Sequence, residues 1–142
     1  MRLTHLADYA VVIMTAAARR EAESRASAKE PARLSASELA EETGVPLPTT
    51  QKLMGRLAAE GLLTSVRGAA GGFALARPAG EISLADVVEA VEGPIAMTVC
   101  AGHEGVSDCA LDAHCKVKPH MGVVGNAIRG ALGAVSLTEL AQ

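Results

Sequence analysis

The chain has 142 residues, of which 49% are hydrophobic and 1% aromatic, and its formal net charge is −3. This length suits one compact domain with an extension. No apolar run approaches the roughly 20 residues that a membrane helix needs, and the N-terminus lacks the pattern of a signal peptide. We therefore expect a cytoplasmic protein that does not enter a membrane.

Charge is distributed unevenly along the chain. Residues 1–77 carry 10 Lys and Arg against 8 Asp and Glu, whereas residues 78–142 carry 3 against 8. The first part could therefore face a polyanion, and the second part would repel one. The excess in the first part is small, so charge alone does not distinguish a nucleic-acid surface from an ordinary solvated one.

The first half of the chain is predicted to contain three helices. Apolar residues recur at helical spacing over 5–20, and residues 21–33 are typical of a fraying helix end and a loop. In residues 34–44, Ser35 and Glu38 fit a capping box, and a glycine is placed to end the helix. A third helix over 45–61 follows at once, so the last two helices predict a helix-turn-helix.

Residues 62–77 predict a β-hairpin directly after this helix pair. Side chains alternate on both sides of "GAAGG", which is typical of two short antiparallel strands. Such a loop could also be a flexible turn or bind a phosphate, but it lacks the Lys-Ser/Thr ending of a nucleotide-binding loop. A helix-turn-helix followed by a hairpin is a winged helix.

The predicted winged helix suggests a surface for double-stranded DNA. The N-terminal residues of its second helix should face base edges in the major groove. A glutamine there can make a bidentate contact with adenine, and basic residues suit phosphates or, near the wing tip, a minor groove. The candidate contacts are Thr49, Thr50, Gln51, Lys52, Arg56 and Arg67. The alternative is a plain solvated helix face.

Residues 82–94 and 117–135 are predicted to form two more helices. In the second of them, apolar residues recur at spacings of three and four, which is typical of a coiled-coil-like seam: Met121, Val124, Ile128, Leu132 and Val135. Four glycines in the same stretch would each destabilise a helix by about 1 kcal/mol relative to Ala, which indicates close approach of a neighbouring helix. We therefore expect a homodimer, and Ser136 with Glu139 predicts a last short helix.

All three cysteines, Cys100, Cys109 and Cys115, lie in the loop between these two helices. Cytoplasmic thiols stay reduced, so an odd number favours metal or redox chemistry over disulfides. The gaps of eight and five residues lack the paired Cys-x2-Cys of zinc fingers and suit an iron–sulfur cluster. A zinc site and three ordinary buried thiols stay open. Three thiols leave one coordination position, for which His103, His114, His120 and a distant Asp8 are candidates.

We do not expect an enzyme. The sequence offers no Ser-His-Asp or Cys-His constellation, no nucleotide-binding loop and no pair of carboxylates framing a pocket. An iron–sulfur carrier is a further alternative, although a carrier has no need of a helix-turn-helix. We expect residues 1–80 to form the winged helix-turn-helix DNA-binding domain and residues 81–142 to form the cluster-binding loop and a long dimerisation helix.

"MRLTHLADYAVVIM", "SVRGAAGGFALARP" and "ISLADVVEAVEGP", followed by three cysteines, resemble the IscR/NsrR family of winged-helix regulators, and most of all its regulators of the SUF iron–sulfur assembly system. The resemblance covers nearly the whole chain. It implies a homodimer that binds a palindromic operator, represses iron–sulfur assembly genes, and holds one cluster per subunit, either [2Fe-2S] or [4Fe-4S], on the three cysteines. Gln51 and Arg67 match the family's major-groove and wing contacts.

The chain departs from the family pattern at two places. The first cysteine gap is eight residues, where the better-known members have five, and Lys118 stands where IscR-like proteins have a histidine. NsrR-like members use an acid near the N-terminus of the partner subunit, and Asp8 falls at that position. The resemblance therefore implies Asp8 as the fourth ligand, with His120 and His103 as alternatives.

Overall fold

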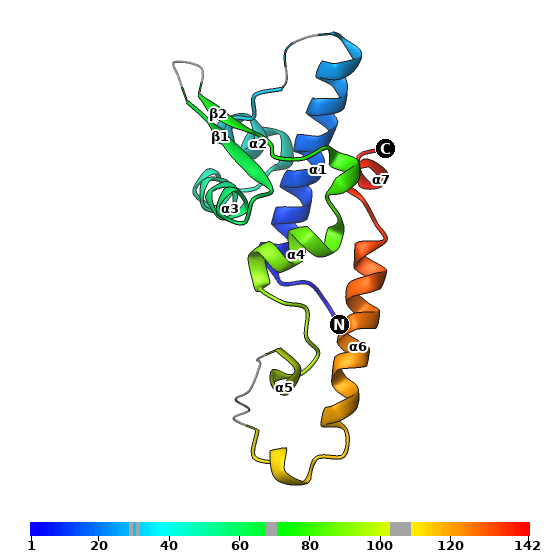
Figure 1. The fold of residues 1–142 in the computed structure, drawn as a ribbon. Coiled ribbons are helices and arrows are strands. Elements are labelled where there is room, and N and C mark those ends of the chain that lie inside the picture. Colours follow the sequence, from blue (N-terminus) through cyan, green and yellow to red (C-terminus); the bar gives the residue numbers. More distant parts are fainter. Residues whose placement is uncertain (29, 31, 68–70, 103–108) are drawn as a thin grey trace.

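The structure is a computed structural model that describes residues 1–28, 30, 32–67, 71–102 and 109–142. Its elements occur in the order α1 (His5–Ala26), α2 (Ala36–Thr43), α3 (Leu47–Ala59), β1 (Leu63–Val66), β2 (Gly72–Leu75), η1 (Ala79–Glu81), α4 (Leu84–Glu92), α5 (Val99–Gly102), η2 (Asp112–His114), α6 (Lys118–Gly133) and α7 (Leu137–Leu140). The predicted class, mainly α with a small β-hairpin, is confirmed. Helices α1–α4 and the hairpin form a body from which α5, η2 and most of α6 extend as an arm (Figure 1).

Helix α1 is longer than the sequence predicted. It continues to Ala26, where we expected fraying from residue 21. A salt bridge of 2.7 Å between Arg25 and Glu21, one turn apart, favours the extra turn. The buried face of α1 is mostly alanine, and these small side chains let α2, α3, α4 and α7 pack closely around it.

The helix-turn-helix forms as predicted, with one difference at its first cap. The Ser35 hydroxyl accepts a hydrogen bond from the backbone N–H of Glu38, and Gly44 ends α2 in the left-handed conformation at φ 76°. The Glu38 carboxylate, however, turns to Arg20 of α1, 2.7 Å away, instead of completing the predicted capping box. This salt bridge thus connects α2 to α1, and the sequence of α2 alone does not predict it.

The hairpin is fixed to the helix pair through its second strand. Strands β1 and β2 are antiparallel, with Leu63 opposite Leu75 and Val66 opposite Gly72. Leu34, just before α2, exchanges two backbone hydrogen bonds of 2.7 and 2.8 Å with Phe73. A Cβ at Gly72 would lie 2.7 Å from the carbonyl oxygen of Leu34, so only glycine permits this approach. The wing tip, residues 68–70, lies outside the described residues.

One hydrophobic core contains residues from both parts of the chain. Ile13, Met54 and Leu57 from the winged helix are buried together with Val87 of α4 and Leu137 of α7. The backbone N–H of Leu137 bonds to the carbonyl oxygen of Ile82 at 2.9 Å, which anchors the chain after α6. The boundary that we predicted near residue 80 therefore separates two proposed roles, and the two parts share one core.

The glycines of α6 serve a close contact at one position. A Cβ at Gly125 would lie 3.4 Å from the carbonyl oxygen of Ile95, so this glycine lets α6 pack on the segment that leads to Cys100. Within the described residues, nothing lies within 4 Å of a Cβ built at Gly122, Gly130 or Gly133. Close approach to another part of the same chain thus explains only one of the four glycines.

Candidate DNA interface and thiol pocket

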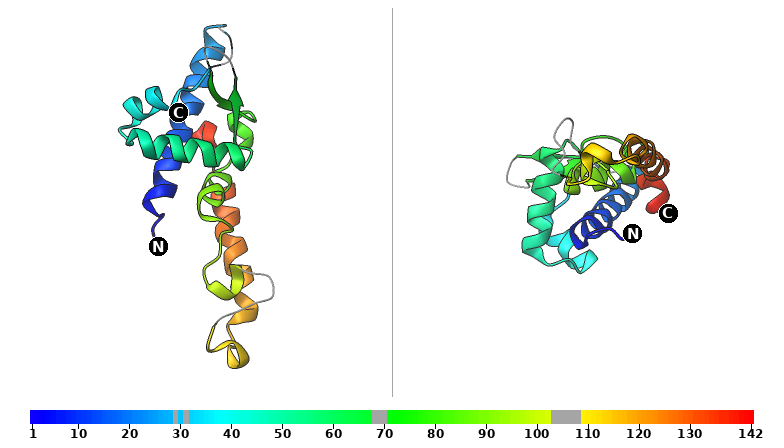
Figure 2. Two further views of the ribbon diagram at one scale, coloured as in Figure 1. Left: turned by 90° about the vertical axis from the view of Figure 1, so that its left-hand side faces the viewer. Right: turned by 90° about the horizontal axis from the view of Figure 1, so that it is seen from below.

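Helix α3 divides its residues between the core and one exposed face. Leu53, Met54 and Leu57 are buried, whereas Gln51 and Lys52 are exposed. Pro48 lies in the first turn, where a missing backbone N–H costs nothing. Helix α3 and the hairpin lie on one side of the molecule, and α6 lies on another (Figures 1 and 2). Helix α3, which carries these two exposed side chains, packs against the first strand of the hairpin.

Thr50 does not belong to this surface, contrary to the sequence-based expectation. Its side chain is 0% exposed. Its hydroxyl donates to the carbonyl oxygens of Val45 at 3.3 Å and Pro46 at 3.2 Å, and so closes the turn before α3. Thr49 is only half-buried. The helical period therefore turns Thr50 inward, although the residue is adjacent to Gln51.

Replacing Thr50 by Val should lower the free energy of unfolding by about 1 kcal/mol, because one net hydrogen bond is lost at nearly constant volume. The base preference of the protein should stay unchanged. Chemical denaturation and selection from a random DNA pool measure the two effects, and Thr49→Val is the matched control for the loss of stability. A changed base preference with unchanged stability would indicate that Thr50 contacts DNA after all.

The two arginines proposed for DNA differ in their surroundings. The Nε of Arg56 donates to the carbonyl oxygen of Ala90 in α4 at 3.0 Å, so this side chain also ties α3 to α4. Arg67 is exposed directly after β1, at the start of the wing tip. Arg67 thus stands where a wing contact would require it, and Arg56 carries a structural contact that the sequence did not indicate.

The three cysteines line one pocket on the arm. The pocket has a volume of about 420 Å³, and its other lining residues are mostly apolar: Thr98, Val99, Val117, Lys118 and Met121. Cys100 comes from α5, and Cys109 and Cys115 come from either side of η2. Cys109 is exposed, the other two are half-buried, and each carries a thiol and no disulfide. Residues fifteen positions apart in the sequence therefore line the same pocket.

Local hydrogen bonds shape this pocket. The backbone N–H of Asp112 bonds to the carbonyl oxygen of Cys109 at 3.0 Å, which turns the chain back toward Cys115. The Thr98 hydroxyl lies 3.1 Å from the sulfur of Cys100. Within the described part of the chain, no three His, Cys, Asp or Glu side chains are grouped around a single metal position.

Lys118 is the basic residue of the pocket lining. Its ammonium forms a salt bridge with Asp112. The hydrogen bond that the ammonium donates to Asp112 raises the pKa of Lys118, and the electrostatic interaction with Cys100 and Cys109 raises it further. The sequence had marked Lys118 only as a departure from a family pattern. Its pairing with Asp112, six positions earlier, follows no helical spacing and could not be read from the sequence.

The candidates for a fourth ligand lie outside the lining of this pocket. Asp8 is exposed in the first turn of α1, and α1 lies in the body, away from the thiol end of the arm (Figure 1). His120 is exposed at the start of α6 and does not line the pocket. His103 lies outside the described residues.

Helix α4 joins the arm to α3. The Glu89 carboxylate accepts hydrogen bonds from Arg129 of α6 at 3.1 Å and from the backbone N–H of Ile95 at 3.3 Å. The next residue, Ala90, holds Arg56 of α3 through its carbonyl oxygen. Two successive residues of α4 thus contact the thiol arm and the proposed DNA-reading helix.

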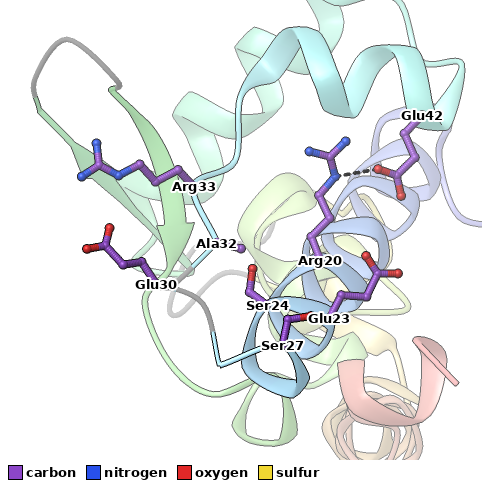
Figure 3. A pocket seen from close by; sticks show the side chains of 8 residues that line it. All are labelled: Arg20, Glu23, Ser24, Ser27, Glu30, Ala32, Arg33 and Glu42. Atoms are coloured by element: carbon purple, nitrogen blue, oxygen red, sulfur yellow. Dashed lines mark hydrogen bonds and ion pairs between the residues drawn. The ribbon is translucent and has the colours of Figure 1, made fainter.

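A second, polar pocket of about 730 Å³ lies where α1 and α2 meet (Figure 3). Arg20 is held there by Glu42 and Glu38, both at 2.7 Å. The hydrogen bond to Glu42 is the main cause that raises the pKa of Arg20. Because the arginine is already paired with two carboxylates, we interpret it as a tie between the helices.

The chain is similar to known transcriptional regulators. Residues 3–142 match the family Rrf2, described as "Iron-dependent Transcriptional regulator". The chain is 34% identical over 142 residues to the HTH-type transcriptional regulator IscR of Xenorhabdus nematophila, covering 100% of this chain and 80% of that protein. The same-named regulator of Photorhabdus laumondii is 34% identical over 140 residues, with 99% and 79% covered.

Solved structures share the fold. CymR (YrzC), the global cysteine regulator of B. subtilis, matches with a TM-score of 0.71 at 23% identity, covering 99% of this chain and 96% of that chain. T. potens IscR matches with a TM-score of 0.68 at 24% identity, covering 99% and 85%. Among the described residues, no helix combines the length and apolarity that a bilayer crossing requires.

Proposed function

Because the chain belongs to the Rrf2 family of transcriptional regulators and not to an enzyme family, we propose that its affinity for DNA is controlled by an iron–sulfur cluster held in the thiol pocket. The observation that carries this proposal is the meeting of Cys100, Cys109 and Cys115 in one pocket on an arm joined to the recognition helix. We expect the protein to act as a repressor of iron–sulfur assembly genes in the cytoplasm.

The donor set of the pocket fits such a cluster. Thiolates are the ligands that iron–sulfur clusters use in most proteins, and an apolar lining limits the access of water. When bound, the cluster would supply iron that responds to the redox state and to small oxidants. Both [2Fe-2S] and [4Fe-4S] are compatible with three thiols. A zinc-binding or metal-free regulator is the alternative, and an iron–sulfur carrier is less favoured because the chain has a winged helix.

We propose that the partner's Asp8 completes the ligand set. Asp8 is exposed on its own chain and remote from its own thiol pocket, so intersubunit ligation is the arrangement left to it. An oxygen ligand would hold iron less firmly than a thiolate, because carboxylates suit harder metals. His120 and His103 remain the alternatives.

A homodimer is supported by the outward face of α6. Val123 is 69% exposed and Val124 37% exposed, and Ala127 and Ala131 follow on the same face. Two residues of the predicted seam, Ile128 and Leu132, are half-buried beside a pocket that the N-terminal segment of the same chain also lines, so we propose the exposed face as the dimer contact. Small and apolar side chains on an exposed helix favour close packing with a second helix. A twofold dimer would present two recognition helices to a palindromic site.

Coupling between the pocket and DNA requires an element that connects the arm to α3. Helix α4 meets this requirement, because Glu89 holds the arm and Ala90 holds Arg56 of the recognition helix. A state of the pocket that moves the arm would change the placement of α3. A difference of about 1.4 kcal/mol between the two states would change DNA affinity tenfold.

The DNA-reading role is tested on α3. Gln51→Ala should relax base preference at one position of each half-site and weaken binding by roughly 1–3 kcal/mol. Lys52→Ala should weaken binding to all sequences alike and reduce the salt slope by about one. DNA selected from a random pool by the wild-type protein, titrated at several salt concentrations, separates these effects. Unchanged binding by both variants would mean that α3 does not contact DNA.

The proposed function as a whole is tested by purification without oxygen. A visible chromophore with equal amounts of iron and sulfide, and a DNA affinity that changes when the cluster is removed, would support it. Colourless protein containing zinc would select the zinc-binding alternative. A cluster without any effect on DNA affinity would contradict the regulatory role.

A further inference from the structure

Lys118 brings a fixed positive charge to the wall of the thiol pocket. It lines the pocket together with all three cysteines, so its ammonium shares the pocket wall with their sulfurs. Its ammonium is paired with Asp112, in the turn between Cys109 and Cys115. An exposed lysine would normally sample many rotamers, and this salt bridge holds it beside the sulfurs.

A salt bridge between two partly exposed side chains adds little to folding stability. The position of the salt bridge, in contrast, affects the electrostatic environment of the thiol pocket. A thiolate-bound iron–sulfur cluster carries negative charge, and nearby charges and hydrogen-bond donors shift its reduction potential. A positive charge stabilises the more negative, reduced form, and therefore raises the potential.

We propose that Lys118 is a positioning residue for the pocket, which places a positive charge beside Cys100 and Cys109 and raises the reduction potential of the cluster held there. The second part of this inference, the effect on the reduction potential, rests on the proposed function. Asp112 acts as the anchor that keeps the ammonium in place. Lys118 would thus act through its charge, because its protonated nitrogen has no free lone pair with which to bind iron as a histidine does.

Three variants test the placement of the charge in cluster-free protein. Lys118→Met removes the charge, Lys118→Arg keeps it, and Lys116→Met removes a matched charge from an exposed residue that does not line the pocket. The thiols are allowed to react with 5,5′-dithiobis(2-nitrobenzoate), which is anionic, and with 4,4′-dithiodipyridine, which is neutral. The ratio of the two rates reports local charge and is insensitive to the thiolate fraction.

We expect the anionic-to-neutral ratio to fall roughly threefold in Lys118→Met, the size of effect that one nearby surface charge produces, and to stay near wild type in the other two variants. An unchanged ratio in Lys118→Met overturns the inference. Circular dichroism checks that every variant keeps its helices, and rescue by Lys118→Arg distinguishes charge from packing.

The same variants are then measured with the cluster in place, by anaerobic redox titration. Lys118→Met should lower the midpoint potential by roughly 30 mV, which is a threefold change at about 59 mV per tenfold for one electron. A lower rate ratio with an unchanged potential would overturn the tuning role. Wild-type protein without any cluster would instead refute the proposed function, and the rate ratio would still decide where Lys118 places its charge.

Discussion

Replacing any one of Cys100, Cys109 and Cys115 by Ala should abolish or greatly weaken the visible absorption of protein purified without oxygen. All three sulfurs line one pocket, so each variant removes one of a small number of ligands from the same centre. Iron and sulfide analysis together with the absorption spectrum provides the measurement. Val99→Ala, which alters the lining of the same pocket without removing a thiol, should keep the spectrum.

A wild-type spectrum in Cys109→Ala would exclude this exposed thiol from the ligand set. The fourth ligand is examined with the same spectra. Asp8→Ala should form a cluster with an altered spectrum that is lost sooner in air, because a weaker or exchangeable ligand would replace the carboxylate. If Asp8→Ala matches the wild type and His120→Ala does not, the histidine is the ligand and the assignment to Asp8 is wrong.

Replacing Ala127 by Asp should convert the homodimer into monomers. Ala127 is exposed on the outward face of α6, beside the exposed Val123 and Val124, and a carboxylate would be desolvated between two packed helices. Affinity for a two-half-site operator should fall roughly a hundredfold or more, because each winged helix would then bind without the other. Analytical ultracentrifugation and DNA titration measure the two effects.

The neighbouring substitution Asn126→Asp is the matched control. It introduces the same charge on the same helix, at an exposed position about 100° around the helix axis from Ala127. We expect this variant to remain dimeric. Wild-type protein that sediments as a monomer at micromolar concentration would contradict the dimer itself, and equal dissociation in both variants would mean that this face of α6 is not the interface.

The sequence by itself determined the elements that depend on local chemistry. The cap at Ser35, the helix end at Gly44, the capping box at Ser136, and the hairpin around its Gly-rich loop were all predicted from residues a few positions apart. These signals work because a hydrogen bond or a permitted φ angle is decided within one turn of chain. The order helix, helix, hairpin followed directly, and the spacing of the cysteines pointed to one shared site.

Only the tertiary structure decided which side chains are exposed and unpaired enough to bind DNA or a second subunit. Thr50 is buried, Glu38 pairs with α1, and Ile128 packs partly within its own chain, because burial depends on which helix lies across from each face. The same holds for the thiol pocket, where the salt bridge between Asp112 and Lys118 sets a charge beside two sulfurs. These contacts depend on how distant turns meet after packing, and neither hydrophobic period nor residue spacing encodes that meeting.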